Sequence, residues 1–211
     1  MIPLQSRRLP KNIHLFLGHV QAEITPNALC GGIVRPNRAT RMPIKDSSLD
    51  HARQRRQQAA ENYRPDHLKI LLVAEAPPAA DDRYFYFLNV SSQDHLFLNV
   101  CDVVLGKRPS RNDKSDALAE LKNSGIYLID LKPDPVDGSK LSNYVADLIR
   151  RCKELEPSNI ILIKATVFDV AYTALHDAGL PVANHRIYFP SCGRQNDFRM
   201  QFRAALDDIS S

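Results

Sequence analysis

A regular alternation of apolar blocks and amphipathic segments begins at residue 66, and it restricts the possible folds strongly. The apolar blocks are LKILLVAEA (68–76), IYLIDL (126–131), NIILIKA (159–165) and HRIYFP (185–190). Short continuous apolar runs suit strands that are buried on both faces. Strands that alternate with crossover helices form parallel sheets. We therefore expect an α/β fold, a three-layer α/β/α arrangement with a mainly parallel, four-stranded central sheet.

Helical periodicity fills the intervals between these blocks. Apolar residues recur every three or four positions in the predicted helices 94–105, 115–123, 141–155, 167–175 and 198–209. Gly125, Pro157 and Gly179 lie where such helices end, because glycine and proline do not continue a helix. Thr166 is the expected N-cap of the helix that follows the third strand.

The first third of the chain differs from the rest in charge. Residues 1–65 hold 11 Lys and Arg against 4 Asp and Glu, a net of 11 − 4 = +7, whereas residues 66–211 hold 17 against 20, a net of −3. We expect a basic arm with a charged helix at 48–62 in residues 1–65, and an α/β domain in residues 66–211. The basic excess indicates contact with a polyanion such as DNA, with an ordinary solvated surface as the alternative.

The cysteines and the apolar segments exclude several classes of protein. Cysteines stand singly at positions 30, 101, 152 and 192, which is not a zinc or iron-sulfur spacing, and no segment is long and apolar enough to span a membrane. We expect a cytoplasmic protein with reduced thiols that needs no metal and no cofactor.

The predicted sheet indicates where a ligand binds. In open parallel sheets, ligands bind outside the carboxyl ends of the strands. Those ends are the segments 75–78, 130–133, 164–166 and 190–192, and two of them begin with a carboxylate, Glu75 and Asp130.

Three of these strand ends resemble motifs of one family. VAEAPP (73–78) resembles the GEAPG motif of the uracil-DNA glycosylase superfamily. IYLIDLKPDP (126–135) is similar to its strand that ends in a base-reading Asn, and YFPSCGRQNDFRMQF (188–202) to its HPS-type loop and following helix. The resemblance spans residues 68–208 and implies hydrolysis of the N-glycosidic bond of a base that has been flipped out of DNA.

The resemblance implies that Glu75 positions the attacking water and stabilises the oxocarbenium character that develops on the sugar. Asp81 and Asp82 on the same loop are rival carboxylates. The alternative for Glu75 is a polar residue that merely closes a strand.

The expected base pocket departs from the family pattern in two places. Ala76 and Pro77 of the first motif would line it, and Phe85 or Phe87 would stack on the base. Asp130 occupies the position of the usual Asn; an ionised Asp only accepts hydrogen bonds, whereas a protonated Asp regains a donor.

Phe189 replaces the usual His and cannot stabilise a developing anion. His185, Ser191, Arg194 or backbone amides of the 191–193 turn are the expected substitutes. Arg194 or Gln195 is expected to fill the space that the flipped base vacates. The expected contacts to DNA phosphates are Lys132, Arg35, Arg38 and Arg41.

These features together predict a monomeric, monofunctional DNA repair glycosylase that excises uracil or a related damaged base. Two alternatives stay open: a catalytically silent relative that binds nucleic acid, and a nucleoside or nucleotide hydrolase on the same scaffold.

Overall fold

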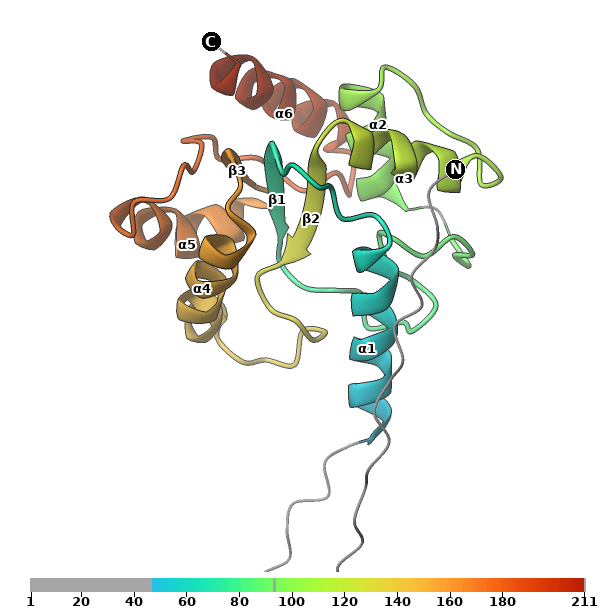
Figure 1. Cartoon of the computed structure of the whole chain (residues 1–211), viewed down its shortest axis with the longest axis horizontal. Coiled ribbons are helices and arrows are strands. Elements are labelled where there is room, and N and C mark those ends of the chain that lie inside the picture. Colours follow the sequence, from blue (N-terminus) through green and yellow to red (C-terminus); the bar gives the residue numbers. More distant parts are fainter. Residues whose placement is uncertain (1–46, 93, 211) are drawn as a thin grey trace, which may run out of the picture. The chain divides into compact units, whose positions relative to one another are not determined.

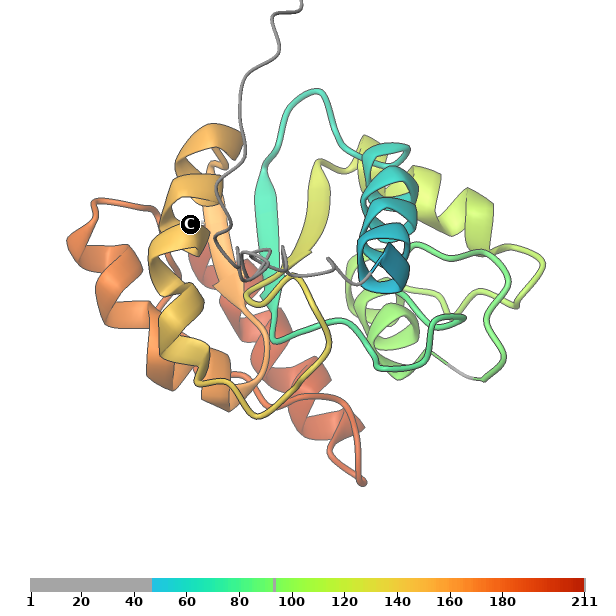
Figure 2. The same ribbon diagram turned by 90° about the horizontal axis from the view of Figure 1, so that it is seen from below.

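A three-stranded parallel sheet forms the centre of the protein (Figure 1). The computed structural model describes residues 47–92 and 94–210. The strands are β1 (Ile70–Ala74), β2 (Ile126–Asp130) and β3 (Asn159–Leu162), in the spatial order β2-β1-β3 (Figure 2). Both β2 and β3 pair with β1 in parallel, which confirms the α/β class and the parallel sheet.

The apolar composition of the strands explains their central position. Leu71, Leu72 and Val73 of β1 are fully buried, as are Ile160, Ile161 and Leu162 of β3. A side chain on either face of these strands is therefore removed from water, which requires helices on both sides of the sheet.

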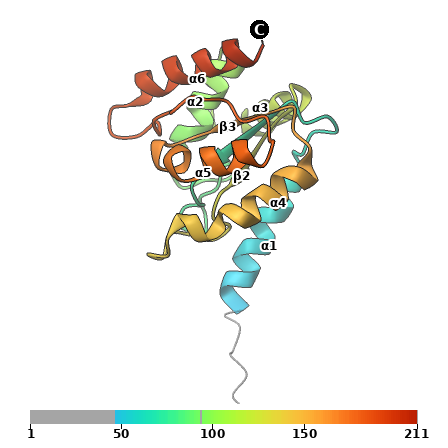
Figure 3. The same cartoon turned by 90° about the vertical axis from the view of Figure 1, so that its left-hand side faces the viewer.

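Six α-helices occur in the described part of the chain. They are α1 (Ser47–Glu61), α2 (His95–Val104), α3 (Lys114–Asn123), α4 (Val145–Leu155), α5 (Ala165–Asp177) and α6 (Gln195–Ile209). A short 3₁₀ helix, η1 (Leu141–Tyr144), leads into α4. Helix α2 packs against α6 and α3, and α4 packs against α5. Figure 3 shows α2 and α6 on one side of the sheet and α4 and α5 on the other. No helix in the described ranges is long and apolar enough to cross a membrane.

The predicted fourth strand at 185–190 does not form. This part of the chain touches β3 only through two isolated parallel bridges, Ile160 with Val182 and Ile163 with Ile187. Ile160 lies in β3 and Ile163 directly follows it; three positions separate these two residues, but five separate their partners, so the two segments do not pair in one continuous register. The pairing is therefore interrupted, and the sheet ends at β3.

The open edge of β2 is protected by a tyrosine hydroxyl. Tyr86, 3% exposed, accepts a hydrogen bond from the Leu128 amide at 2.7 Å and donates to the Leu128 carbonyl at 3.2 Å. An unpaired strand edge is otherwise a template for pairing with another chain. The side chain thus replaces part of a missing neighbouring strand.

Candidate active site

A cavity of about 450 Å³ opens at the carboxyl ends of the strands. The size lies in the range of small-molecule binding sites. The connection that follows β1 leads to β2 on one side of it, whereas β3 lies on the other side of β1. The connections at the carboxyl ends of β1 and β3 therefore run in opposite directions. Such a divergence leaves a crevice at the strand ends. Seven predicted site residues line the cavity: Glu75, Ala76, Pro77, Phe85, Asp130, Phe189 and Ser191.

Glu75 follows β1 directly and forms an ion pair with Lys164, which follows β3. The pair uses the Oε2 atom of Glu75 and leaves Oε1 without a hydrogen bond among the described residues. The Glu75 side chain is 19% exposed and that of Lys164 is 37% exposed. Burial lowers the pKa of Lys164.

Lys164 also has an unusual backbone. It is the N-cap residue of α5, with φ 88° and ψ 127°. The predicted cap, Thr166, instead lies inside the helix. A positive φ in a residue other than glycine costs free energy, and such residues concentrate at functional sites. The conformation turns the chain sharply between β3 and α5, at the point where Lys164 meets Glu75.

Asp130, the last residue of β2, lies beside Ala74 of β1 and contributes to the cavity wall. Burial raises the pKa of its carboxyl group to about 7, against the opposing effect of Arg151 and Arg56. Near neutral pH, Asp130 therefore exists in both the protonated and the ionised form.

The aromatic run after β1 does not extend as a strand. Residues 84–87 form a turn, in which the Phe87 amide donates to the Tyr84 carbonyl at 3.0 Å. Tyr84 and Phe85 line the cavity, whereas Phe87 lies outside its lining with the Arg55 guanidinium 4.8 Å from its ring centroid. Of the two predicted stacking residues, the turn thus places only Phe85 at the cavity.

Phe189 and Ser191, in the segment that leads to α6, line the same cavity. The Arg194 amide donates to the Ser191 carbonyl at 3.0 Å and closes a turn in which Cys192 and Gly193 have positive φ. The Arg194 side chain is exposed, with its guanidinium 4.2 Å from the centroid of the Tyr188 ring. Gln195 begins α6. Both predicted loop residues therefore lie beside the cavity without lining it.

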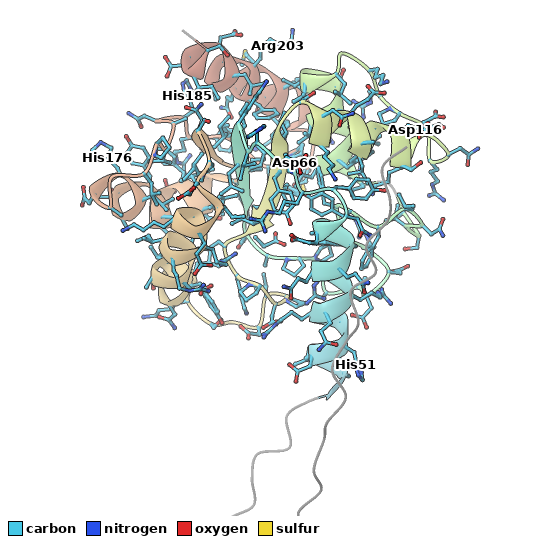
Figure 4. The ribbon with its side chains drawn as sticks, viewed as in Figure 1. His51, Asp66, Asp116, His176, His185 and Arg203 are labelled. Atoms are coloured by element: carbon cyan, nitrogen blue, oxygen red, sulfur yellow. The ribbon has the colours of Figure 1, made fainter. Side chains whose placement is uncertain are left out.

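Four other predicted residues lie away from the cavity. Asp81 and Asp82 are exposed and do not line it, so their side chains are not placed to act on a bound base. His185 lies near the C-terminal part of α6 (Figure 4), with Nε2 3.4 Å from Asp208. Lys132 is 1% exposed and pairs with Asp137, so its charge is not free to contact phosphate. His185 and Lys132 are thus each engaged by a carboxylate of the protein itself, and Lys132 is also buried.

The remaining predicted contacts, Arg35, Arg38 and Arg41, and the basic arm to which they belong lie outside the described residues.

Several polar residues of the cavity were not among those predicted from the sequence. Arg83 lines it and has no ion pair within the described chain. Asp94 and His95 lie at the start of α2, where Asp94 accepts a hydrogen bond from the Phe97 amide and pairs with Lys114. Lys164 had a usable signal, because it ends a predicted strand. Arg83 and His95 carry no local pattern that distinguishes them from surface residues.

Across 47–92 and 94–210, no three His, Cys, Asp or Glu side chains group as a metal site.

Comparison of the chain with models of known protein families and with curated proteins gave no match.

Proposed function

We propose that the protein is a DNA glycosylase of the uracil-DNA glycosylase type, which hydrolyses the N-glycosidic bond of a uracil or related base flipped into the cavity. The observation that carries the proposal is the meeting of the ends of β1 and β2 with the segment before α6 at one cavity. Glu75, Asp130 and Phe189 are far apart in sequence and line the same space. Each belongs to one of the three motifs that resemble the glycosylase superfamily.

Glu75 is the proposed catalytic carboxylate. Oε1 of Glu75 is free to accept a hydrogen bond from a water molecule, because the ion pair with Lys164 involves Oε2. The water attacks C1′ of the sugar while the C1′–N bond breaks; the electron pair of that bond leaves with the base as an anion, and the proton that the water loses passes to Glu75. The negative charge of Glu75 stabilises the positive charge that develops on the sugar.

The flipped base is proposed to stack on aromatic rings. Phe85 and Phe189 line the cavity, and stacking on an aromatic side chain contributes about 1–3 kcal/mol per base. This gain offsets the cost of flipping, which is of a similar size. Arg83 is the proposed donor to the leaving base, since Phe189 provides no hydrogen bond.

The test is release of a base from oligonucleotides that carry a single uracil, hypoxanthine, xanthine or etheno base, measured as abasic sites. We expect the wild-type protein to release at least one of them and Glu75→Gln to slow release by about 10²- to 10⁴-fold. The control is Asp81→Asn/Asp82→Asn, which should keep the wild-type rate because both side chains lie outside the cavity. No release from any substrate, or an unchanged rate in Glu75→Gln, would disprove the proposal.

The ion pair of Glu75 supports a second candidate. A carboxylate held by Lys164 also suits a protein that binds nucleic acid without cleaving it. DNA affinity that falls steeply with salt, with no abasic product, would identify this binding protein. Release of a base from free nucleosides, uninhibited by DNA, would instead indicate a nucleoside hydrolase.

A further inference from the structure

A positively charged hollow of about 590 Å³ lies where α2 packs against α6. Its lining consists of Asp102 of α2, Arg108 from the loop after α2, and Arg199, Met200 and Arg203 of α6. Three arginines and one aspartate give this lining a net charge of 3 − 1 = +2. None of the five residues lines the cavity that contains Glu75, so the hollow is a separate feature of the surface.

The sequence of α6 places two of these arginines on one face of the helix. Phe198 and Phe202, four residues apart, are fully buried, and Arg199 and Arg203 each follow one of them. Arg199 and Arg203 are therefore also four residues apart and are neighbours on the helix surface. Arg203 is exposed on α6 (Figure 4). Like charges at this spacing destabilise a helix, and a bound anion would remove that cost.

A single carboxylate oxygen serves two of the three guanidinium groups. The Oδ2 atom of Asp102 lies 3.2 Å from Nη1 of Arg199 and 3.4 Å from Nη1 of Arg108. Arg203 has no hydrogen bond or ion pair among the residues that the structure describes. The lining of the hollow thus neutralises its positive charge only in part, which favours a ligand that carries negative charge.

Arg199 is held in place by a buried amide. Its Nη1 atom donates to Oδ1 of Asn99 at 3.2 Å, and Nδ2 of Asn99 donates to the His95 carbonyl at 2.7 Å. Asn99 is fully buried, and Arg199 also donates to Asn196. A guanidinium group that is oriented before a ligand arrives loses less conformational entropy on binding.

The chemistry of the lining favours a chain of phosphates over a small molecule. Small-molecule sites are lined mainly by apolar and aromatic side chains, whereas four of the five lining residues here are charged and Met200 is 68% exposed. Guanidinium groups bind phosphate oxygens through paired N–H donors. Arg199 and Arg203 are about 6 Å apart along the axis of α6, close to two steps of about 3.4 Å along one DNA strand.

Both helices lead from the cavity to the hollow. Asp94 and His95 at the start of α2 line the cavity, as does Ser191, which precedes α6. Asp102 lies about two turns along α2, and Arg199 about one turn along α6. A nucleic acid strand that reaches the cavity can therefore continue to the hollow.

We propose that Arg108, Arg199 and Arg203 bind backbone phosphates of the DNA that flank the nucleotide whose base enters the cavity. This inference rests on the proposed function, because it takes DNA as the ligand. Contacts of this kind do not read the sequence. They add affinity and fix the direction in which the DNA lies across the cavity.

The experiment measures binding of the full-length protein to an undamaged DNA duplex at several salt concentrations. Arg108→Gln/Arg203→Gln removes two of the three charges and keeps Arg199 with its contacts to Asn99. We expect the slope of log affinity against log salt concentration to decrease by about 2, because two fewer phosphate contacts release counterions.

Two further variants separate charge from position. Arg108→Lys/Arg203→Lys keeps both charges and should keep the wild-type slope. The matched control, Arg150→Gln/Lys153→Gln, removes two charges from α4, on the opposite side of the sheet from α6 (Figure 3), and should leave the slope unchanged. A thermal melt of each variant confirms that it is folded.

The same slope in the wild type and in Arg108→Gln/Arg203→Gln, or an equal decrease in the α4 control, would overturn the inference. Titration with inorganic pyrophosphate tests the other source of phosphate. If Arg108→Gln/Arg203→Gln loses pyrophosphate binding but keeps the wild-type slope for DNA, the hollow binds a small phosphate compound and the inference is wrong. The expected decrease in slope, in a protein that releases no base, would count against the glycosylase reaction alone.

Discussion

At the level of single residues, Glu75 and Lys164 illustrate how a site is built from two neighbouring strand ends. Glu75 follows β1 and Lys164 follows β3, and the parallel pairing of these strands brings the two side chains together. Lys164 reaches this position with φ 88°, a backbone conformation that favours glycine. The position therefore stores strain at the same point where it supplies a charge to the cavity.

Two substitutions of Lys164 distinguish the effect of its backbone strain from the effect of its charge. Lys164→Gly removes the ammonium and relieves the backbone, whereas Lys164→Ala removes the ammonium and keeps the strained φ. We expect Lys164→Gly to be more stable than Lys164→Ala by about 1 kcal/mol, measured by chemical denaturation. Both variants should slow base release by about 10- to 100-fold, because Glu75 loses the partner that orients it.

If the two variants are equally stable, the backbone of Lys164 is not strained. If both release the base at the wild-type rate, Lys164 does not position Glu75.

At the level of secondary-structure elements, the register of β1 and β2 depends on a glycine. The Gly125 carbonyl, just before β2, accepts from the Lys69 and Ile70 amides at 2.9 and 3.0 Å. Gly125 has φ 78°, and a Cβ atom there would lie 2.7 Å from Cγ of Lys69 and 3.0 Å from the His67 carbonyl oxygen. Gly125 follows the end of α3, and its lack of a side chain leaves room for His67 and Lys69, which precede β1.

Gly125→Ala should therefore destabilise the protein more than the same substitution at a glycine that has a positive φ but no close neighbours. Gly179 has φ 74° and open space around it, so Gly179→Ala provides the matched control. We expect Gly179→Ala to cost about 1–2 kcal/mol for the backbone conformation. Gly125→Ala should cost about 1–3 kcal/mol more because neighbouring atoms must move.

Unfolding in urea measures both free energies. Equal losses in the two variants would show that the close contact at Gly125 relaxes without cost.

At the level of the whole molecule, the charge is divided between two parts of the chain. Residues 1–65 have a net charge of +7 and residues 66–211 of −3. Arg35, Arg38 and Arg41 contribute three of these positive charges, and their contact with DNA stays a prediction from the sequence. Attraction to phosphates would bring DNA to the cavity without reading its sequence.

Arg35→Ala/Arg38→Ala/Arg41→Ala should weaken binding to undamaged DNA and reduce the slope of log affinity against log salt concentration by about 3. The control is Lys69→Ala/Lys122→Ala/Lys153→Ala. Lys69 and Lys122 lie by the amino ends of the strands, opposite the cavity, and Lys153 lies near the end of α4 that leads to β3. A fluorescence titration at several salt concentrations gives the slopes.

If both triple variants lose the same slope, the basic arm has no special role in DNA binding.

The helices and three of the strands were predictable from the sequence, because their hydrophobic periodicity is a local property. The helix predicted at 94–105 corresponds to α2, and the run at 126–131 contains β2. The strand predicted at 185–190 was wrong, since whether an apolar segment pairs continuously depends on the register of its neighbour.

The candidate site, like the fold, was predictable from the sequence only in part. Glu75 and Asp130 were identifiable because strand ends in a parallel sheet meet at one edge, and this follows from the order of the elements along the chain. The pairing of Glu75 with Lys164, the burial of Lys132 and the raised pKa of Asp130 depend on distances between segments far apart in sequence. Local composition determined the elements and the edge of the sheet at which the cavity lies. Only the tertiary structure decided which charges are paired, which are buried and which face the cavity, because desolvation and Coulomb interactions depend on position in space.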